Sequence, residues 1–130
     1  FEIDERRQIL MVLKHSWTVT IVYMVLISIL SHIPQDDIPE SITSGPDNID
    51  MFFHFVEYSI LGFLLFRSII SDESLAFYPL YGSLLIGISF AILDEFHQSF
   101  VPGRHMSSID MLFDSIGIVF GTFAYSKTRN

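Results

Sequence analysis

Long apolar runs alternate with short polar stretches along the whole chain. A helix needs about 20 mostly apolar residues to cross a bilayer. Four runs approach this length, at roughly 16–33, 50–70, 77–97 and 108–125. A buried helix of a soluble bundle should carry a polar stripe, and the first and third runs show almost none. The pattern predicts an all-α fold, an integral membrane bundle of four transmembrane helices that forms a single domain over residues 1–130.

The polar connections carry turn and loop signals. The stretch 34–49 is acidic and contains three prolines and a glycine, so we expect a loop there. The sequence SDES at 71–74 predicts a tight turn, and Pro102-Gly103 predicts another within 99–107.

The basic residues predict an orientation. Arg6, Arg7 and Lys14 precede the first run, Arg67 lies near the second connection, and Lys127 and Arg129 follow the last run. Because Lys and Arg concentrate in cytoplasmic segments, both termini are predicted to be cytoplasmic. The connections at 34–49 and 99–107 then face outward, and only Arg104 departs from the rule.

Composition agrees with a protein of the cell membrane. Half of the residues are hydrophobic, 17% are charged and 13 are phenylalanine. The net charge of −8 disfavours nucleic acid as a partner, because nucleic-acid-binding domains carry basic patches. The absence of cysteine excludes disulfides and thiolate metal sites. The predicted partner is the lipid bilayer.

Ionisable residues concentrate at the predicted outer end of three runs. In a bundle, these residues reach the same bilayer face, and ionisable groups at membrane depth indicate function by default. The candidates are Asp50 and His54 on the second run, Asp94, Glu95 and His97 on the third, and Asp110 and Asp114 on the fourth.

Helical spacing assigns these residues to faces. Asp50, His54, Glu57 and Tyr58 share one face of the second helix. Glu57 lies about 10 Å deeper than Asp50 and needs a partner, either His54 or a group on another helix. On the third helix, Asp94, His97 and Gln98 are expected to share a face, with Glu95 about a quarter turn away.

The fourth helix combines acids near its start with deeper glycines. Asp110, Asp114, Gly117 and Gly121 share a face, and such glycines allow close helix packing. Ser107 is expected to cap this helix, with Asp110 at the capping-box position. A second interpretation is an anion site, in which Gly103, Arg104 and the helix N-terminus hold a phosphate or carboxylate. A third is that Arg104 pairs only with Asp94 or Asp110.

The same groups raise the question of a metal. Nitrogen and oxygen ligands are available from His54, Glu57, Asp94, His97 and Asp110. No HExxH or similarly sharp spacing is present, so no metal site is predicted and no cofactor is assigned. His15 and His32, at the ends of the first run, are expected to be ordinary surface groups.

Two stretches resemble the VanZ-like family of small membrane proteins. DMFFHFVEYSILGFLL at 50–65 is similar to the family pattern D-K-x-x-H-F-x-x-Y-x-x-L-G. LDEFHQSFVPGRHMSSIDMLFDSIG at 93–117 is similar to D-E-x-x-Q-x-F-x-P-G-R-x-x-S-x-x-D-x-x-x-N-x-x-G. The matching positions are Asp50, His54, Tyr58, Gly62, Asp94, Glu95, Gln98, Pro102, Gly103, Arg104, Asp110 and Gly117.

The resemblance implies a multi-pass protein linked to resistance to glycopeptides such as teicoplanin. Met51 stands where the family pattern has lysine, and Asp114 stands where it has asparagine. Both departures make the site more negative, which weakens the case for an anion site.

Two functions remain open at this level. One is an enzyme, a hydrolase or transferase on a lipid or lipid-linked cell-wall intermediate. Asp94 or Glu95 would be the base, with His97 or His54 as partner. Arg104, Gly103, Gln98, Asp50, Tyr58, Asp110 and Asp114 would surround the substrate. The alternative is a non-catalytic binding or scaffold module whose polar cluster is structural.

Overall fold

Four long helices make up the structure, a computed structural model that describes residues 2–34, 47–104 and 106–128. They are α1 (Glu2–Ser31), α3 (Asp47–Ser71), α4 (Pro79–Gln98) and α5 (Ser108–Thr128). Each is long and apolar enough to cross a membrane by length and composition. The predicted four-helix, all-α architecture is confirmed. Of the predicted loop at 34–49, residues 35–46 lie outside the described residues, and residues 47–49 already belong to α3.

The first helix begins much earlier than predicted. The apolar run suggested a start near residue 16, and α1 begins at Glu2. Residues 2–15 contain no glycine or proline and are rich in Glu, Arg, Leu and Met, which are good helix formers. Hydropathy marks the part of a helix suited to lipid and does not detect a polar extension beyond it.

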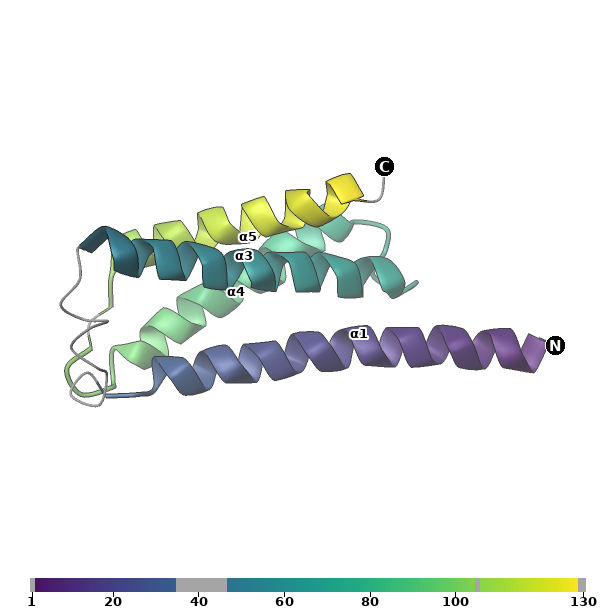
Figure 1. Cartoon of the computed structure of the whole chain (residues 1–130), viewed down its shortest axis with the longest axis horizontal. Helices are drawn as coiled ribbons and strands as arrows, with labels where there is room; N and C mark the ends of the chain where they lie inside the picture. The colour runs from purple at the N-terminus through teal and green to yellow at the C-terminus, as the bar shows by residue number, and fades with distance from the viewer. Residues whose placement is uncertain (1, 35–46, 105, 129–130) are drawn as a thin grey trace.

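Helices α3 and α5 lie side by side, α4 crosses them obliquely, and α1 lies along the α3 side and extends beyond the other helices (Figure 1). The end of α1, the start of α3, the end of α4 and the start of α5 meet at one end of the bundle. The two chain termini lie toward the opposite end. The structure therefore brings the predicted polar segments together at one end.

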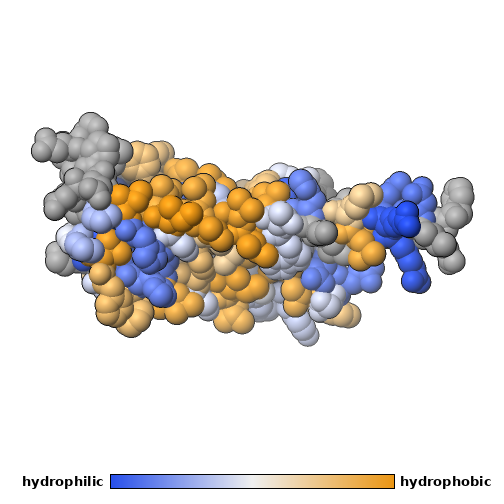
Figure 2. Space-filling view, turned by 90° about the horizontal axis from the view of Figure 1, so that it is seen from below, coloured by the Kyte–Doolittle hydropathy of each residue, from blue (hydrophilic) through white to orange (hydrophobic). Residues whose placement is uncertain are grey.

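The interior is small and most large apolar side chains face outward. Its apolar core consists of Ile27, Tyr58, Leu61, Leu65, Ala91 and Ile118. The exposed apolar residues include Val22, Phe53, Leu85 and Phe120, which come from all four helices. On the face that carries α1, apolar residues cover the middle and hydrophilic residues gather mostly toward the ends (Figure 2). Such a surface suits surrounding lipid tails.

Glycines let α3 and α5 pack backbone to backbone, as the spacing of Gly117 and Gly121 predicted. A Cβ on Gly117 would lie 2.6 Å from the carbonyl oxygen of Phe55, and one on Gly121 would overlap the carbonyl of Ser59. Gly62 makes the reciprocal approach from α3, against the backbone of Ile118. This pair carries both sides of the acidic cluster described below.

Hydroxyl groups join the helices within the bundle. Thr20 Oγ1 on α1 lies 2.7 Å from Ser68 Oγ on α3. Ser83 Oγ on α4 lies 2.8 Å from Thr122 Oγ1 on α5. In a lipid environment such bonds satisfy polar groups that water cannot reach.

The short connections are turns, as predicted. Asp72 accepts hydrogen bonds from the Ser74 hydroxyl and backbone N–H at 2.6 and 3.0 Å. These bonds hold the pKa of Asp72 below its ordinary value. At the other end, Gly103 has a φ of 77°, a conformation that glycine adopts without strain, so it completes the Pro102-Gly103 turn.

Candidate functional site

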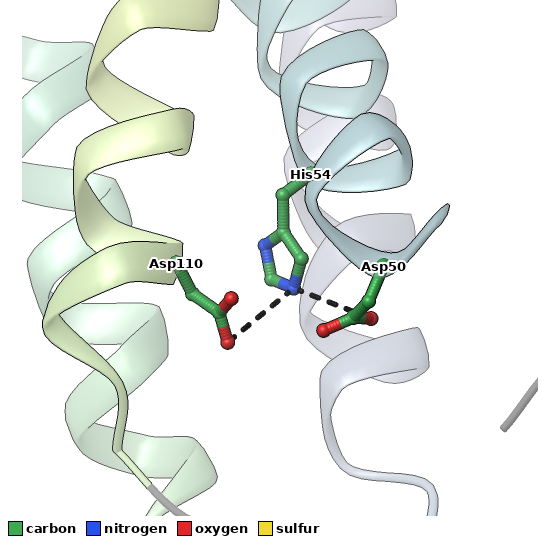
Figure 3. Close-up of side chains that lie close together, drawn as sticks. All are labelled: Asp50, His54 and Asp110. Atoms are coloured by element: carbon green, nitrogen blue, oxygen red, sulfur yellow. Dashed lines mark ion pairs between the residues drawn. The ribbon is translucent and has the colours of Figure 1, made fainter. Parts of the chain in front are cut away.

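A histidine and three aspartates meet between α3 and α5 at the polar end of the bundle. His54 Nδ1 lies 2.8 Å from Asp114 Oδ1, and Asp114 is only 1% exposed. His54 Nε2 lies 3.9 Å from Asp110 Oδ2 and 4.0 Å from Asp50 Oδ1 (Figure 3). These separations exceed hydrogen-bond length, so Nε2 makes no direct hydrogen bond to either carboxylate.

The orientation of His54 is determined by Asp114. When Asp114 is ionised, its carboxylate only accepts hydrogen bonds, so the 2.8 Å contact then has its proton on His54 Nδ1. In the neutral ring, Nε2 then carries the lone pair that can accept a proton. Catalytic and metal-binding histidines often show this arrangement: a carboxylate bonds one ring nitrogen, and the second ring nitrogen faces a substrate or ion.

Asp110 can face His54 because another residue completes the helix cap. Ser107 Oγ accepts the Asp110 backbone N–H at 3.3 Å, so Ser107 caps α5 as predicted. In a capping box, the residue at the Asp110 position would accept the Ser107 N–H in return. Here Glu95 Oε1 from α4 accepts that N–H at 3.0 Å. The capping box is therefore shared between two helices, and the Asp110 carboxylate remains available.

Asp94 lies in a separate, buried arrangement between α1, α3 and α4. Its Oδ2 accepts hydrogen bonds from Ser31 Oγ at 2.7 Å and from Tyr58 OH at 3.1 Å. Asp94 is 8% exposed and Tyr58 is 1% exposed. The carboxylate thus joins three helices, and Ser31 is a partner that the sequence analysis missed. A serine ending an apolar run is the signal that could have suggested it.

Arg104 holds the 99–104 turn against α1 and α4. Its Nε donates to the backbone oxygen of Ile33 at 3.1 Å. Gln98, with its amide oriented to satisfy both neighbours, accepts from Arg104 Nη1 at 2.5 Å and donates to Glu95 Oε2 at 2.9 Å. Among the described residues, every ion pair within 4.0 Å involves His54, so Arg104 does not pair directly with Asp94 or Asp110.

His97 does not share the inner face with Asp94, contrary to the expected grouping. Asp94, Glu95 and Gln98 are buried, whereas His97 is exposed, with its ring centroid 5.8 Å from that of His32 on α1. The buried face of α4 is centred between Asp94 and Glu95, because α5 approaches from the Glu95 side. Glu57 is half-buried, and its backbone oxygen accepts Tyr23 OH at 2.7 Å.

Three members of the His54 cluster could hold a cation. Asp50, His54 and Asp110 each offer a ligand atom, and these atoms all lie within 4.8 Å of one another. One imidazole nitrogen and two carboxylate oxygens suit several divalent ions. The other donors considered from the sequence, Glu57, Asp94 and His97, are not part of this group.

The comparisons with known proteins identify the family. The VanZ/LLP1 family model matches residues 5–129, nearly the whole chain. The chain belongs to the VanZ/LLP1 family. This confirms the resemblance seen in the two motifs, and four membrane-length helices agree with a membrane location. No curated protein and no solved structure matches this VanZ/LLP1 chain.

Most motif residues of this VanZ/LLP1 member surround the polar end. They fall into the acidic cluster, the Asp94–Tyr58 contact and the Arg104–Gln98–Glu95 network. Gly62 and Gly117 serve instead to bring α3 and α5 together. The motif is thus explained partly by polar contacts and partly by helix packing.

Proposed function

We propose that this VanZ/LLP1 protein is an enzyme of the cell membrane. In this proposal, His54 exchanges a proton with a lipid or lipid-linked cell-wall intermediate. The observation that carries it is the pairing of His54 with the buried Asp114, which leaves Nε2 directed toward Asp50 and Asp110. General acid–base catalysis needs a titratable group held in one orientation with one atom open to the substrate.

The setting supports a substrate of the outer leaflet. Basic residues near both termini favour cytoplasmic ends, which places the polar end of the bundle on the extracytoplasmic side. Labelling of single cysteines introduced at Asp50 and at Met106, with a reagent that does not cross membranes, tests this orientation. Both positions should react in intact cells, and protection of either would contradict it.

Turnover in nanodiscs tests the reaction. The purified protein is given labelled phospholipids and polyprenyl phosphates, with and without added Mg²⁺, Mn²⁺ or Zn²⁺. We expect conversion of one substrate class, lost in His54→Gln and retained in His15→Gln, whose exposed histidine lies outside the site. A general acid or base contributes about 100-fold or more to rate. No turnover under any of these conditions, or equal turnover by both variants, would contradict the proposal.

We also propose, from the family alone, a role in resistance to glycopeptides such as teicoplanin. Cells expressing the protein should tolerate a higher teicoplanin concentration than cells expressing the His54→Gln variant at equal membrane level. Equal susceptibility of both cell types would contradict this role, and it would not affect the conclusion drawn from turnover in nanodiscs.

One observation favours a non-catalytic alternative, a binding or scaffold module. Arg104, Gln98 and Glu95 form a continuous network that connects the Ile33 carbonyl of α1 to the Ser107 N–H at the start of α5. Such a network can fix helix packing without chemistry. Arg104→Lys and Glu95→Gln distinguish the two roles. If both variants mainly lower the melting temperature while any turnover persists, this network is structural.

A further inference from the structure

An apolar groove runs along the outside of the bundle between α1 and α4. Its volume is about 500 Å³, and it is lined by α1 side chains between Ile21 and His32 and by Phe90 of α4. Groove residues Ile21, Val25 and Ile29 are strongly exposed. The groove lies on the apolar side of the molecule that carries α1 (Figure 2).

The length of the groove corresponds to one leaflet. Eleven helical steps separate Ile21 from His32, which is about 16 Å at the rise of an α-helix. The hydrocarbon core of a bilayer is about 30 Å thick, so one leaflet contributes about 15 Å. An acyl chain lying in the groove would therefore end near the middle of the membrane. A polyprenyl chain would be much longer than this groove.

The polar end of the groove carries nitrogen groups suited to phosphate. The rings of His32 and His97 lie 5.8 Å apart, and both residues are exposed. His32 Nδ1 donates to the Ser28 carbonyl oxygen at 2.6 Å, so its Nε2 is the nitrogen that remains for a ligand, and it donates to a phosphate when the ring is protonated. Arg104 Nε donates to the carbonyl of Ile33, so a permanent cation lies next to the backbone that directly follows His32.

The two buried carboxylates of α4, Asp94 and Glu95, are bonded to groups within the bundle. Asp94 is directed inward, where Ser31 Oγ and Tyr58 OH both donate to its Oδ2. The acidic cluster of Asp50, Asp110 and Asp114 lies between α3 and α5 around His54, on other helices than the groove. The open apolar groove, about one leaflet long, thus ends at His32, whose ring lies 5.8 Å from that of His97.

We propose that this groove binds one acyl chain of an anionic phospholipid, with the phosphate held by His32, His97 and Arg104. The binding would position a lipid of the same leaflet beside the polar end of the bundle. This inference uses the membrane setting of the proposed function and does not depend on a reaction at His54, so binding is measured separately from turnover.

Native mass spectrometry of the full chain released from detergent micelles tests the proposal. The protein is supplemented with phosphatidylglycerol or phosphatidylcholine that carry identical acyl chains. We expect about tenfold greater retention of phosphatidylglycerol, equivalent to about 1.4 kcal/mol of preference. In a His32→Gln/His97→Gln variant, this preference should fall toward equality, because the phosphate loses two donors.

A second pair of variants tests the groove itself. Ser28→Phe fills the groove, whereas Val22→Phe adds the same ring to an exposed position of α1 outside it. Retention of both phospholipids should fall about tenfold in Ser28→Phe and stay unchanged in Val22→Phe. Circular dichroism confirms that both variants are folded.

Three results would overturn the assignment. Equal retention of the two phospholipids by the unmodified chain would show that the protein does not recognise the head group. Equal phospholipid retention by Ser28→Phe and Val22→Phe would show that the groove does not bind the acyl chain. Displacement of phosphatidylglycerol by an equimolar polyprenyl phosphate would show that the occupant is a different lipid. Loss of turnover in His54→Gln with unchanged lipid retention would support the groove as a site independent of His54.

Discussion

The α3–α5 pair and the α1–α4 pair are built in opposite ways. Three glycines bring α3 and α5 into backbone contact, and a histidine–aspartate bond joins them at the polar end. Between α1 and α4 lies an open groove, and the Ser31–Asp94 hydrogen bond joins the two helices near its end. Close packing suits a site whose atoms must be held in fixed positions. An open groove suits a ligand that enters from the surrounding lipid.

The largest effect is expected from a methyl group at the α3–α5 contact. Gly121→Ala would place a Cβ against the Ser59 carbonyl, so the helices must move apart. We expect a loss of about 2–3 kcal/mol, measured by thermal unfolding in detergent. Gly82→Ala is the control, because its Cβ would meet only the flexible end of Ile69 at 3.3 Å. If both variants unfold at the same temperature, the close packing of α3 and α5 does not determine stability.

Within the acidic cluster, Asp114 should contribute to the stability of the fold and Asp50 should contribute little. Asp114→Ala leaves the half-buried His54 without its partner and should cost about 2 kcal/mol. Asp50→Ala removes an exposed carboxylate 4.0 Å away and should cost less than about 0.5 kcal/mol. Chemical unfolding of the two variants side by side measures the difference. Asp114→Asn should remain stable, since an amide oxygen can still accept the Nδ1 proton.

Arg104 should matter most for the α1–α4 side. Arg104→Lys loses the planar fork that spans Ile33 and Gln98, and we expect about 1 kcal/mol of destabilisation. Because the chain has no cysteine, spin labels can be placed at Val22→Cys/Ile92→Cys across α1 and α4 and at Val56→Cys/Val119→Cys across α3 and α5. Arg104→Lys should broaden only the α1–α4 distance distribution. Equal broadening of both would show that Arg104 supports the whole bundle.

A small effect is also expected where α1 joins α3. Thr20→Val removes the 2.7 Å bond to Ser68 and a bond to the Leu64 carbonyl while keeping the side-chain shape. Interhelical hydrogen bonds in membranes contribute about 0.6 kcal/mol on average. Thermal unfolding should therefore shift by only a few degrees. A loss comparable to that of Gly121→Ala would mean that α1 is held mainly by this joint.

The sequence predicted the elements well and the side-chain partners poorly. Apolar runs located four helices, and helical spacing placed Asp50, His54, Asp110 and Asp114 toward a common end, where the structure brings them together. The same spacing misplaced His97, because a helix wheel shows which residues share a face and does not show from which side the neighbours approach. The roles of these residues in catalysis or substrate binding stay predictions.

What the sequence by itself determined is the requirement for a bundle. Segments of about 20 mostly apolar residues form helices in lipid, and the short connections must return the chain to the other side. Only the tertiary structure decided that Glu95 would cap α5 and leave Asp110 to face His54, and that Arg104 would bind a carbonyl of α1. These partners come from distant parts of the chain. Their selection depends on how closely each pair of helices can approach, which no local pattern specifies.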